Sequence, residues 1–339
     1  MIRYFFLTLF IIFFSACLSM PEKRRYFWPP LPDTPRIEYI GTYGTSADFP
    51  KLTRGEVLFA RLFGEDKGVR VFSKPWGIAS NGEGKVYITD APLMALIIFD
   101  MADREVKVIE EVEHPYGIAV DKEGLLYISS RKYHAVMVFD GDGKALRSFG
   151  ENELVGPAGV GINKELGLLY CVDTLAHDVK VFTLNGDFLY TIGKRGNVEG
   201  TFNFPTDVDV GSAGQVVVAD SLNARIQIFD KEGRFVRAFG ERGKGISGFQ
   251  MIKGIAVDSE DHIYVTDALA SHFKIFSMEG DLLLLLGAPS TAGMPGGFNL
   301  PMDIDIDDND EIHVIDQLNV SFQIYQYLNK KYLEARPVR

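Results

Sequence analysis

Strand-length runs of β-branched and aromatic residues recur along most of the chain, and short polar turns separate them. Residues 85–90 (KVYITD) and 95–100 (ALIIFD) are typical of these runs. Such residues favour β-strands, whereas the glycine, aspartate and asparagine between the runs favour tight turns. The pattern therefore predicts an all-β protein whose neighbouring strands pair as antiparallel hairpins.

One four-strand pattern occurs six times. Its first strand reads Pro-x-Gly-(Ile/Val)-Ala-Val or a variant, its second ends in aspartate, its third ends in phenylalanine and its fourth closes on glycine. The copies begin at Pro75, Pro115, Pro157, Pro205, Ile252 and Pro301. Units of about 40–50 residues with four antiparallel strands are propeller blades, and six of them close a ring. The sequence thus predicts one six-bladed β-propeller domain over residues 36–339.

The fourth copy, GTFNFPTDVDVGSAGQVVVADSLNARIQIFDKEGRFVRAFGERG, resembles the NHL-repeat family of six-bladed propellers. The resemblance rests on its Gly-x-Phe-x-x-Pro lead-in and its Asp-x-x-Asn-x-Arg-Ile-x-x-Phe centre, and it extends from about Lys74 to the C-terminus. Two copies depart from the pattern. Ser130 replaces the strand-ending aspartate of the second copy, and the sixth ends in KKYLEARPVR without the usual glycine.

Two segments compete to complete the last blade. RIEYIGTYG (residues 36–44) looks like a stray fourth strand that would lock the ring, whereas KKYLEA near the C-terminus could occupy the same place. The residues alone leave both alternatives open. Residues 45–73 fit no repeat, and LFARLF within them predicts a short helix.

The first 17 residues are predicted to be a lipoprotein signal. Arg3 precedes an uncharged run over residues 4–14, which is too short to span a bilayer but suits a secretory signal. The following Phe-Ser-Ala-Cys resembles the bacterial lipobox, whose cysteine, here Cys17, is lipidated and becomes the N-terminus. An ordinary cleaved signal and a retained helical anchor are the alternatives. Leu18 after the cysteine favours the outer membrane if the host has two membranes.

Residues 18–35 are predicted to be a tether between the lipid and the propeller. Five prolines lie between residues 20 and 36, and proline stiffens the backbone and removes hydrogen-bond donors.

The net charge of −11 argues against nucleic acid as a binding partner. The second cysteine, Cys171, lies in an apolar strand and is expected to be a buried, unpaired thiol.

One face of the propeller is the predicted binding site. The loop before the first strand and the loop after the second strand of each blade lie on the same face, around the channel. The ligand-binding candidates on this face are Trp76, Tyr116, Thr206, Asp207, Lys253, Met302 and Asp303. The long loops 194–204, 241–251 and 288–300 would wall one side of it. Loops on a rigid scaffold favour binding, so a protein partner or a small ligand is expected here.

Four carboxylates replace small residues at channel positions of the fourth and sixth blades. They are Asp207, Asp209, Asp303 and Asp305. Unpaired carboxylates in a narrow space repel one another, so they need a cation such as calcium, a basic partner, or hydrogen bonds to water or neighbouring strand amides. The strand-ending aspartates are interpreted more simply, as turn residues that accept backbone N–H groups. His313 shares no repeat position with another histidine and indicates no metal site.

These features favour a non-catalytic binding or scaffold module that is lipid-anchored in the bacterial envelope. The sequence contains no nucleophile motif and no phosphate-binding glycine loop. In the amidating lyases of the NHL family, the resemblance places metal-binding histidines at the channel mouth, where this chain has none. The alternative hypothesis is a metal-assisted lyase or hydrolase that uses the four channel carboxylates.

Overall fold

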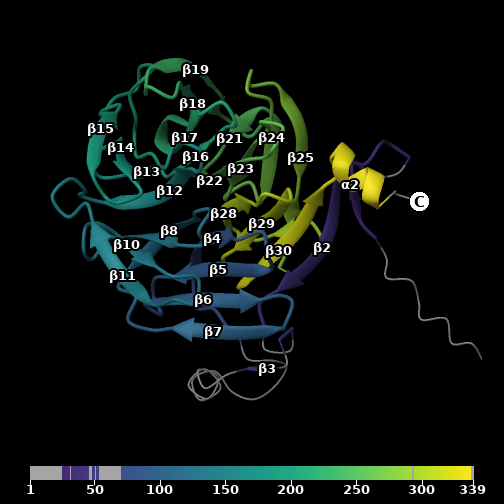
Figure 1. Ribbon diagram of the computed structural model, residues 1–339. Coiled ribbons are helices and arrows are strands. Elements are labelled where there is room, and N and C mark those ends of the chain that lie inside the picture. The colour runs from purple at the N-terminus through teal and green to yellow at the C-terminus, as the bar shows by residue number, and fades with distance from the viewer. Residues whose placement is uncertain are drawn as a thin grey trace, which may run out of the picture.

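The computed structural model describes residues 25–30, 32–45, 48–49, 51–52, 70–291 and 294–336. Six antiparallel blades surround a central channel, as Figure 1 shows in a view along the ring axis. The prediction of an all-β, six-bladed β-propeller is confirmed. The signal and lipobox, residues 1–17, and the helix predicted at residues 58–63 lie outside the described residues.

Each of the first five blades is built from four consecutive strands, ordered from the channel to the rim. Blade 1 contains β4 (Pro75–Ser80), β5 (Lys85–Asp90), β6 (Ala95–Asp100) and β7 (Glu105–Ile109). Blade 2 contains β8 (Pro115–Val120), β9 (Leu126–Ser130), β10 (Ala135–Phe139) and β11 (Ala145–Phe149). Blade 3 contains β12 (Pro157–Asn163), β13 (Leu168–Asp173), β14 (Asp178–Thr183) and β15 (Phe188–Ile192). Blade 4 contains β16 (Asp207–Val210), β17 (Val216–Asp220), β18 (Arg225–Phe229) and β19 (Phe235–Phe239), with the 3-10 turn η1 (Ser221–Asn223) after β17. Blade 5 contains β22 (Ile252–Val257), β23 (Ile263–Asp267), β24 (His272–Phe276) and β25 (Leu282–Leu286).

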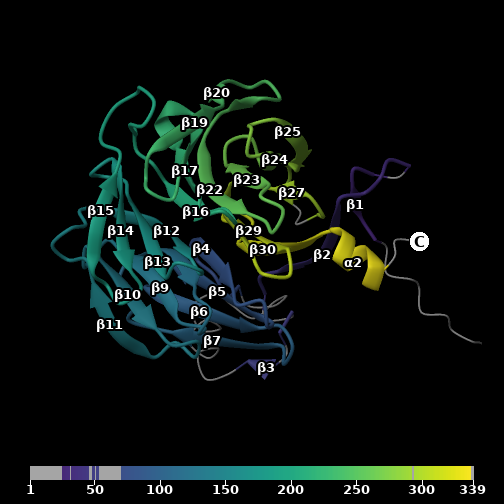
Figure 2. The ribbon, with the colours of Figure 1, turned by 45° about the horizontal axis from the view of Figure 1, so that its top comes forward.

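Blade 6 joins the two ends of the described chain and closes the ring. Its inner strands are β28 (Pro301–Ile306), β29 (Glu311–Asp316) and β30 (Ser321–Tyr327), and its fourth is the N-terminal strand β2 (Ile37–Tyr43). Strand β2 runs antiparallel to β30, and the two lie side by side in both views of the ribbon (Figure 1 and Figure 2). The competing segment KKYLEA forms the helix α2 (Lys330–Ala335) instead, because the side chain of Asn329 caps it by accepting the N–H of Tyr332. RIEYIGTYG is therefore the closing strand.

The second half of the expected tether packs on blade 6, which differs from the prediction of an unpacked spacer. Strand β1 (Phe27–Trp28) pairs with β2 and adds a fifth strand to the blade. Arg25 donates two hydrogen bonds, of 2.6 and 2.7 Å, to the carboxylate of Glu38. The ring of Trp28 meets that of Tyr325 edge-on, with centroids 5.8 Å apart. Packing on blade 6 buries apolar surface of the aromatic residues in this segment, which would stay exposed to water in a free spacer.

Neighbouring blades are joined near the channel by bridging hydroxyl groups and very close backbone contacts. The hydroxyl of Thr89 accepts the N–H of Gly77 at 2.9 Å and donates to the carbonyl of Tyr116 on the next blade. A Cβ on Gly77 would collide with that same carbonyl. Ser129 repeats the bridge from blade 2 to the carbonyl of Ala158 on blade 3. The small residues at the start of the first strands are thus required by the convergence of the blades.

The three long loops share one internal structure. In loop 241–251, β20 (Glu241–Arg242) pairs in parallel with β21 (Gly248–Phe249), and in loop 288–300, β26 (Ala288–Pro289) pairs in parallel with β27 (Gly297–Phe298). Loop 194–204 has a single parallel bridge between Arg195 and Phe202. One phenylalanine of each pairing, Phe202, Phe249 or Phe298, is completely buried and anchors its loop to the blades. A further short strand, β3 (Lys51–Leu52), pairs in parallel with β7. Within the described ranges, no helix is long and apolar enough to cross a membrane.

Candidate functional site

A cavity of about 280 Å³ opens at the mouth of the channel. Six of the seven ligand-binding candidates line it: Trp76, Thr206, Asp207, Lys253, Met302 and Asp303. The seventh, Tyr116, meets the ring of Trp76 edge-on, with centroids 4.7 Å apart. The structure therefore brings together the residues that the blade topology predicted to surround the mouth. Sequence reasoning did not single out Arg131, Phe204, Leu222 and Met251, which also belong to the lining.

Two cations lie at this mouth without an acidic partner in the part of the chain that the structure describes. The ammonium nitrogen of Lys253 lies 5.9 Å from the ring centre of Trp76. The guanidinium carbon of Arg131 lies 3.9 Å from the ring centre of Tyr116, and its Nε donates to the carbonyl of Pro157. Burial, and then the charge of Arg131, lower the pKa of Lys253. An anion that entered the cavity would offset both the burial of the Lys253 charge and its repulsion by Arg131.

Arg131 could have been found from the departure of blade 2 from the repeat. Where the other blades end their second strand with aspartate, blade 2 has Ser130 followed by Arg131. The hydroxyl of Ser130 binds the carbonyl of Glu113, so the loop stays attached without a carboxylate. The loss of one negative charge leaves the neighbouring guanidinium free to stack on Tyr116.

Asp207 and Asp303 form the floor of the cavity. Ile255 N–H donates to Asp207 at 2.8 Å, and Ile78 N–H donates to Asp303 at 2.9 Å, each from the following blade. Burial raises the pKa of Asp303 to about 7, and burial together with the charge of Asp303 raises that of Asp207. The pair therefore holds a proton near neutral pH and can donate a hydrogen bond.

Asp209 and Asp305 lie one step deeper, around an inner cavity of about 80 Å³. Val257 N–H donates to Asp209 and Ser80 N–H donates to Asp305, both at 2.8 Å. Burial raises the pKa of both acids, that of Asp209 to about 6. Hydrogen bonds to neighbouring strand amides, one of the explanations that the sequence left open, thus satisfy one oxygen of each of the four channel acids. A calcium-like ion between them stays a prediction.

Three of the five strand-ending aspartates, Asp90, Asp173 and Asp316, accept a backbone N–H in the following turn as expected, and all five fasten the loops of the mouth face. Each is fully buried and accepts backbone N–H groups from the loop before the first strand of its own blade. The bonds run from residues 73 and 74 to Asp90, from 155 and 156 to Asp173, from 203 to Asp220, from 250 and 251 to Asp267, and from 299 to Asp316. Cys171 is a buried free thiol, as expected.

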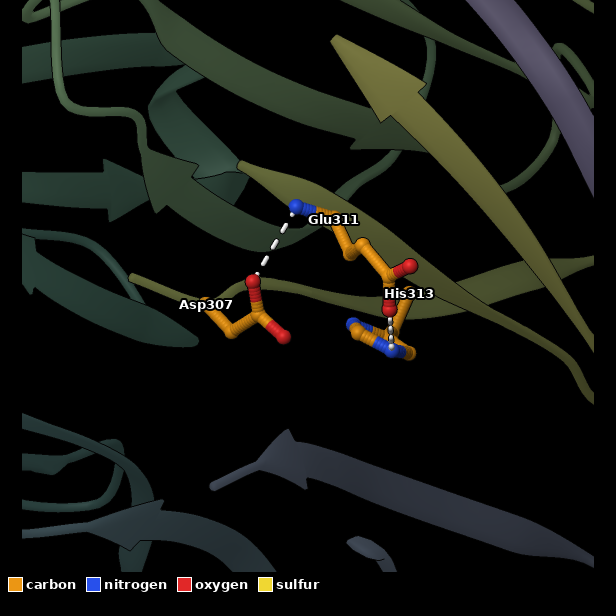
Figure 3. A group of neighbouring side chains, drawn as sticks. All are labelled: Asp307, Glu311 and His313. Atoms are coloured by element: carbon orange, nitrogen blue, oxygen red, sulfur yellow. Dashed lines mark hydrogen bonds and ion pairs between the residues drawn. The ribbon is translucent and has the colours of Figure 1, made fainter. Parts of the chain in front are cut away.

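A second group with ligand-type side chains lies in blade 6, away from the mouth. Asp307, Glu311 and His313 each offer one oxygen or nitrogen atom, and these three atoms lie within 4.8 Å of one another. Figure 3 shows the side chain of Glu311 extending toward the imidazole of His313, with the carboxylate of Asp307 beside them. The repeat pattern does not group them, because His313 shares its repeat position with no other histidine.

Comparison with known proteins supports the fold over most of the chain. Residues 211–285 match the model of a family described as a 6-bladed beta-propeller. No curated protein sequence matches the chain.

Solved structures similar to this chain share its fold but little of its sequence. A protein of unknown function from Bacteroides thetaiotaomicron is 16% identical, with a TM-score of 0.67 over 86% of this chain and 75% of that one. A gluconolactonase from Xanthomonas campestris is 14% identical, with a TM-score of 0.60 over 85% and 98% of the two chains. A catalytically inactive virginiamycin B lyase from Staphylococcus aureus, solved with quinupristin, is 14% identical, with a TM-score of 0.55 over 75% and 95%. At these identities the likeness is one of fold, and the chain is a six-bladed β-propeller.

Proposed function

We propose that this propeller is a non-catalytic binding module that holds a partner protein on the face around the channel mouth. The observation that carries the proposal is a row of exposed leucines at one repeat position, two residues after the strand-ending aspartate. They are Leu175, Leu222, Leu269 and Leu318, each 51–60% exposed. A leucine at the same exposed place in four consecutive blades is apolar surface that folding does not bury.

The long loops extend this apolar surface. Val198, Ile246 and Met294, one in each loop, are 60–68% exposed. The N–H of Leu222 donates to the carbonyl of Asn203 and that of Leu318 to the carbonyl of Asn299, so in blades 4 and 6 the leucine adjoins the long loop of its own blade. The same repeat position holds proline in blade 1 and lysine in blade 2, which confines the apolar surface to blades 3–6.

The chemistry of the mouth indicates what the partner carries. Lys253 and Arg131 lie at the edge of the apolar surface with no acidic partner among the described residues, and the Asp207–Asp303 pair holds a proton below them. A carboxylate on a partner segment would accept from these donors while the surrounding leucines bury its apolar side chains. Such an interface has an apolar centre and a specific polar contact.

A cross-linking experiment in the native envelope tests the proposal. The double variant Leu222→Ser with Leu269→Ser should lose at least 90% of the cross-linked partner recovered with the parent protein. The matched control is Leu146→Ser with Leu283→Ser, which removes two exposed leucines from the rim strands β11 and β25. Equal recovery with both double variants would refute the proposed interface. Recovery should also fall with Lys253→Gln if the partner presents a carboxylate.

We further propose that the blades are NHL repeats and that a lipid on Cys17 holds the propeller at the bacterial envelope, at the outer membrane if there are two. The apolar run and lipobox of residues 1–17 support the anchor. Mass spectrometry of the mature N-terminal peptide should find acylated Cys17, and Cys17→Ser should move the protein from the membrane fraction to the soluble fraction. A mature N-terminus at any other residue contradicts the anchor.

A lyase or hydrolase is the second candidate function, and the Asp207–Asp303 pair favours it. A carboxylic acid with a raised pKa at the floor of a ligand-sized cavity can serve as a general acid. An enzyme of this kind would lose at least 100-fold in rate with Asp303→Asn, whereas the binding module would keep its partner. A screen of lactone and cyclic-ester hydrolysis with both proteins separates the two.

A further inference from the structure

Blade 6 differs from blades 2 and 5 at one pair of positions in the turn between the first two strands. In blades 2 and 5 the turn begins with an aspartate that accepts the hydroxyl of a tyrosine six residues later. Asp121 and Tyr127 form this bond at 3.0 Å, as do Asp258 and Tyr264. Blade 6 keeps the aspartate, Asp307, but six residues later it has His313. The repeat therefore identifies His313 as a replacement for a structural tyrosine.

The replacement leaves a buried imidazole nitrogen without a partner. His313 is 1% exposed, and its Nδ1 has no hydrogen-bond partner among the described residues. The oxygen of Asp307 that would have met a tyrosine accepts instead from the hydroxyl of Ser80 on blade 1, at 3.0 Å. A buried polar atom without a partner is costly, so the surroundings of this imidazole are a candidate ligand site.

Glu311 completes a set of potential ligands. It lies two residues before His313 on β29, so both side chains project from the same face of the strand. Its Oε2 lies 3.9 Å from Nε2 of His313, as the dashed line in Figure 3 marks. A cation between the carboxylates of Asp307 and Glu311 would relieve the repulsion between their charges.

A cavity gives the set access to solvent. It measures about 420 Å³, lies between blades 6 and 1, and is lined by Tyr43, Asp48, Arg104, Glu311 and His313. The guanidinium of Arg104 donates twice to the carbonyl of Asp48, so the one arginine of the lining is already bound. Asp48, Asp307 and Glu311 together outweigh that single positive charge.

We propose that Asp307, Glu311 and His313 form a site for one divalent transition-metal ion of the zinc type. Two carboxylate oxygens and one imidazole nitrogen are a ligand set that zinc accepts, and the cavity leaves a coordination position open to water. The site is separate from the mouth face, and it would tie the closing blade to the first blade through Ser80.

Equilibrium dialysis of the full chain against ZnSO₄ tests the site. The parent protein should bind one zinc per chain at micromolar concentrations, and Co²⁺ in its place should give the visible absorption of a low-coordinate site. The variant His313→Tyr rebuilds the pair of blades 2 and 5, so it should fold and yet lose at least tenfold in zinc affinity. The control His134→Gln changes an exposed histidine of blade 2 and should bind zinc like the parent.

Two further measurements keep the test decisive. Zinc should raise the melting temperature of the parent protein and of His134→Gln, but not that of His313→Tyr. If His313→Tyr fails to fold, Glu311→Gln removes a half-buried ligand with little change of volume, and it too should lose tenfold in affinity. Zinc binding unchanged by either substitution, or a parent protein that binds no zinc at 100 µM, overturns the proposal.

Discussion

Asp207 of blade 4 and Asp303 of blade 6 line the same cavity at the mouth of the channel, and the charge of Asp303 helps to raise the pKa of Asp207, although a whole blade separates them along the ring. Each also accepts a backbone N–H from the blade that follows it, from Ile255 and Ile78 respectively. Because both carboxyl groups are buried, the charge on Asp303 disfavours the charged form of Asp207. Protonation of either carboxyl group therefore affects a contact between blades, that of blade 4 with blade 5 through Asp207 and that of blade 6 with blade 1 through Asp303.

This coupling predicts that the free energy of unfolding falls as the pH rises from about 4 to about 7. Burial raises the pKa of Asp303 from 3.8 to about 7, so the folded protein binds more protons than the unfolded chain in that window. The stabilisation is complete below the unfolded pKa and is lost as the pH passes the folded one. Asp303→Asn cannot titrate and should reduce the difference in melting temperature between pH 5 and pH 7.5 by about 2–4 °C. Parallel pH profiles for parent and variant would contradict the coupling.

The deeper acids predict a difference between two substitutions at one position. Asp209→Ala leaves the N–H of Val257 buried without its acceptor and should destabilise the fold by about 1–3 kcal/mol. Asp209→Asn keeps an acceptor oxygen and removes the charge, so it should cost less than half as much. Urea denaturation at pH 7.5 measures both. If alanine and asparagine are equally costly, the bond to blade 5 is not what Asp209 contributes.

The blades could be predicted from the sequence because every copy repeats the same local signals. Residues on the mouth face, such as Trp76 and Lys253, followed from strand direction alone. The closing strand did not follow, because RIEYIGTYG and KKYLEA are distinguished by pairing between Ile37 and Tyr327, at opposite ends of the chain, and by a helix cap. Neither segment contains a local sequence signal for such long-range pairing.

Two site residues escaped sequence reasoning for different reasons. Arg131 was visible as a departure from the repeat, but its stacking on Tyr116 of the same blade depends on the conformation of the arginine side chain, which the repeat pattern does not predict. His313 was compared with other histidines, whereas its equivalents are Tyr127 and Tyr264. The special character of His313 depends on the aspartate–tyrosine hydrogen bond of blades 2 and 5, which is a feature of the structure and not of the sequence pattern.

Closure of the ring by β2 predicts unequal costs at the two termini. Ile37 is fully buried between blades 5 and 6, so Ile37→Ala should cost about 2–5 kcal/mol. Leu333 lies half-buried on α2, and Leu333→Ala should cost under about 1 kcal/mol. Chemical denaturation of the two variants compares them directly. A larger loss with Leu333→Ala would mean that the C-terminal segment, not β2, holds the ring closed.

The convergence of the first strands predicts that one glycine tolerates no side chain. A Cβ on Gly159 would lie 2.5 Å from the Cα of Asp207, a backbone atom of the next blade that cannot rotate away. Gly159→Ala should therefore lower stability by about 1–3 kcal/mol or more and disturb the floor of the mouth cavity. Gly245→Ala is the matched control, because its Cβ would meet no atom within 4 Å in loop 241–251. Thermal melts should show a fall of several degrees for Gly159→Ala and no fall for Gly245→Ala. Equal melting temperatures would mean that blades 3 and 4 can separate at the channel, and the close contact between them would not be a requirement of the fold.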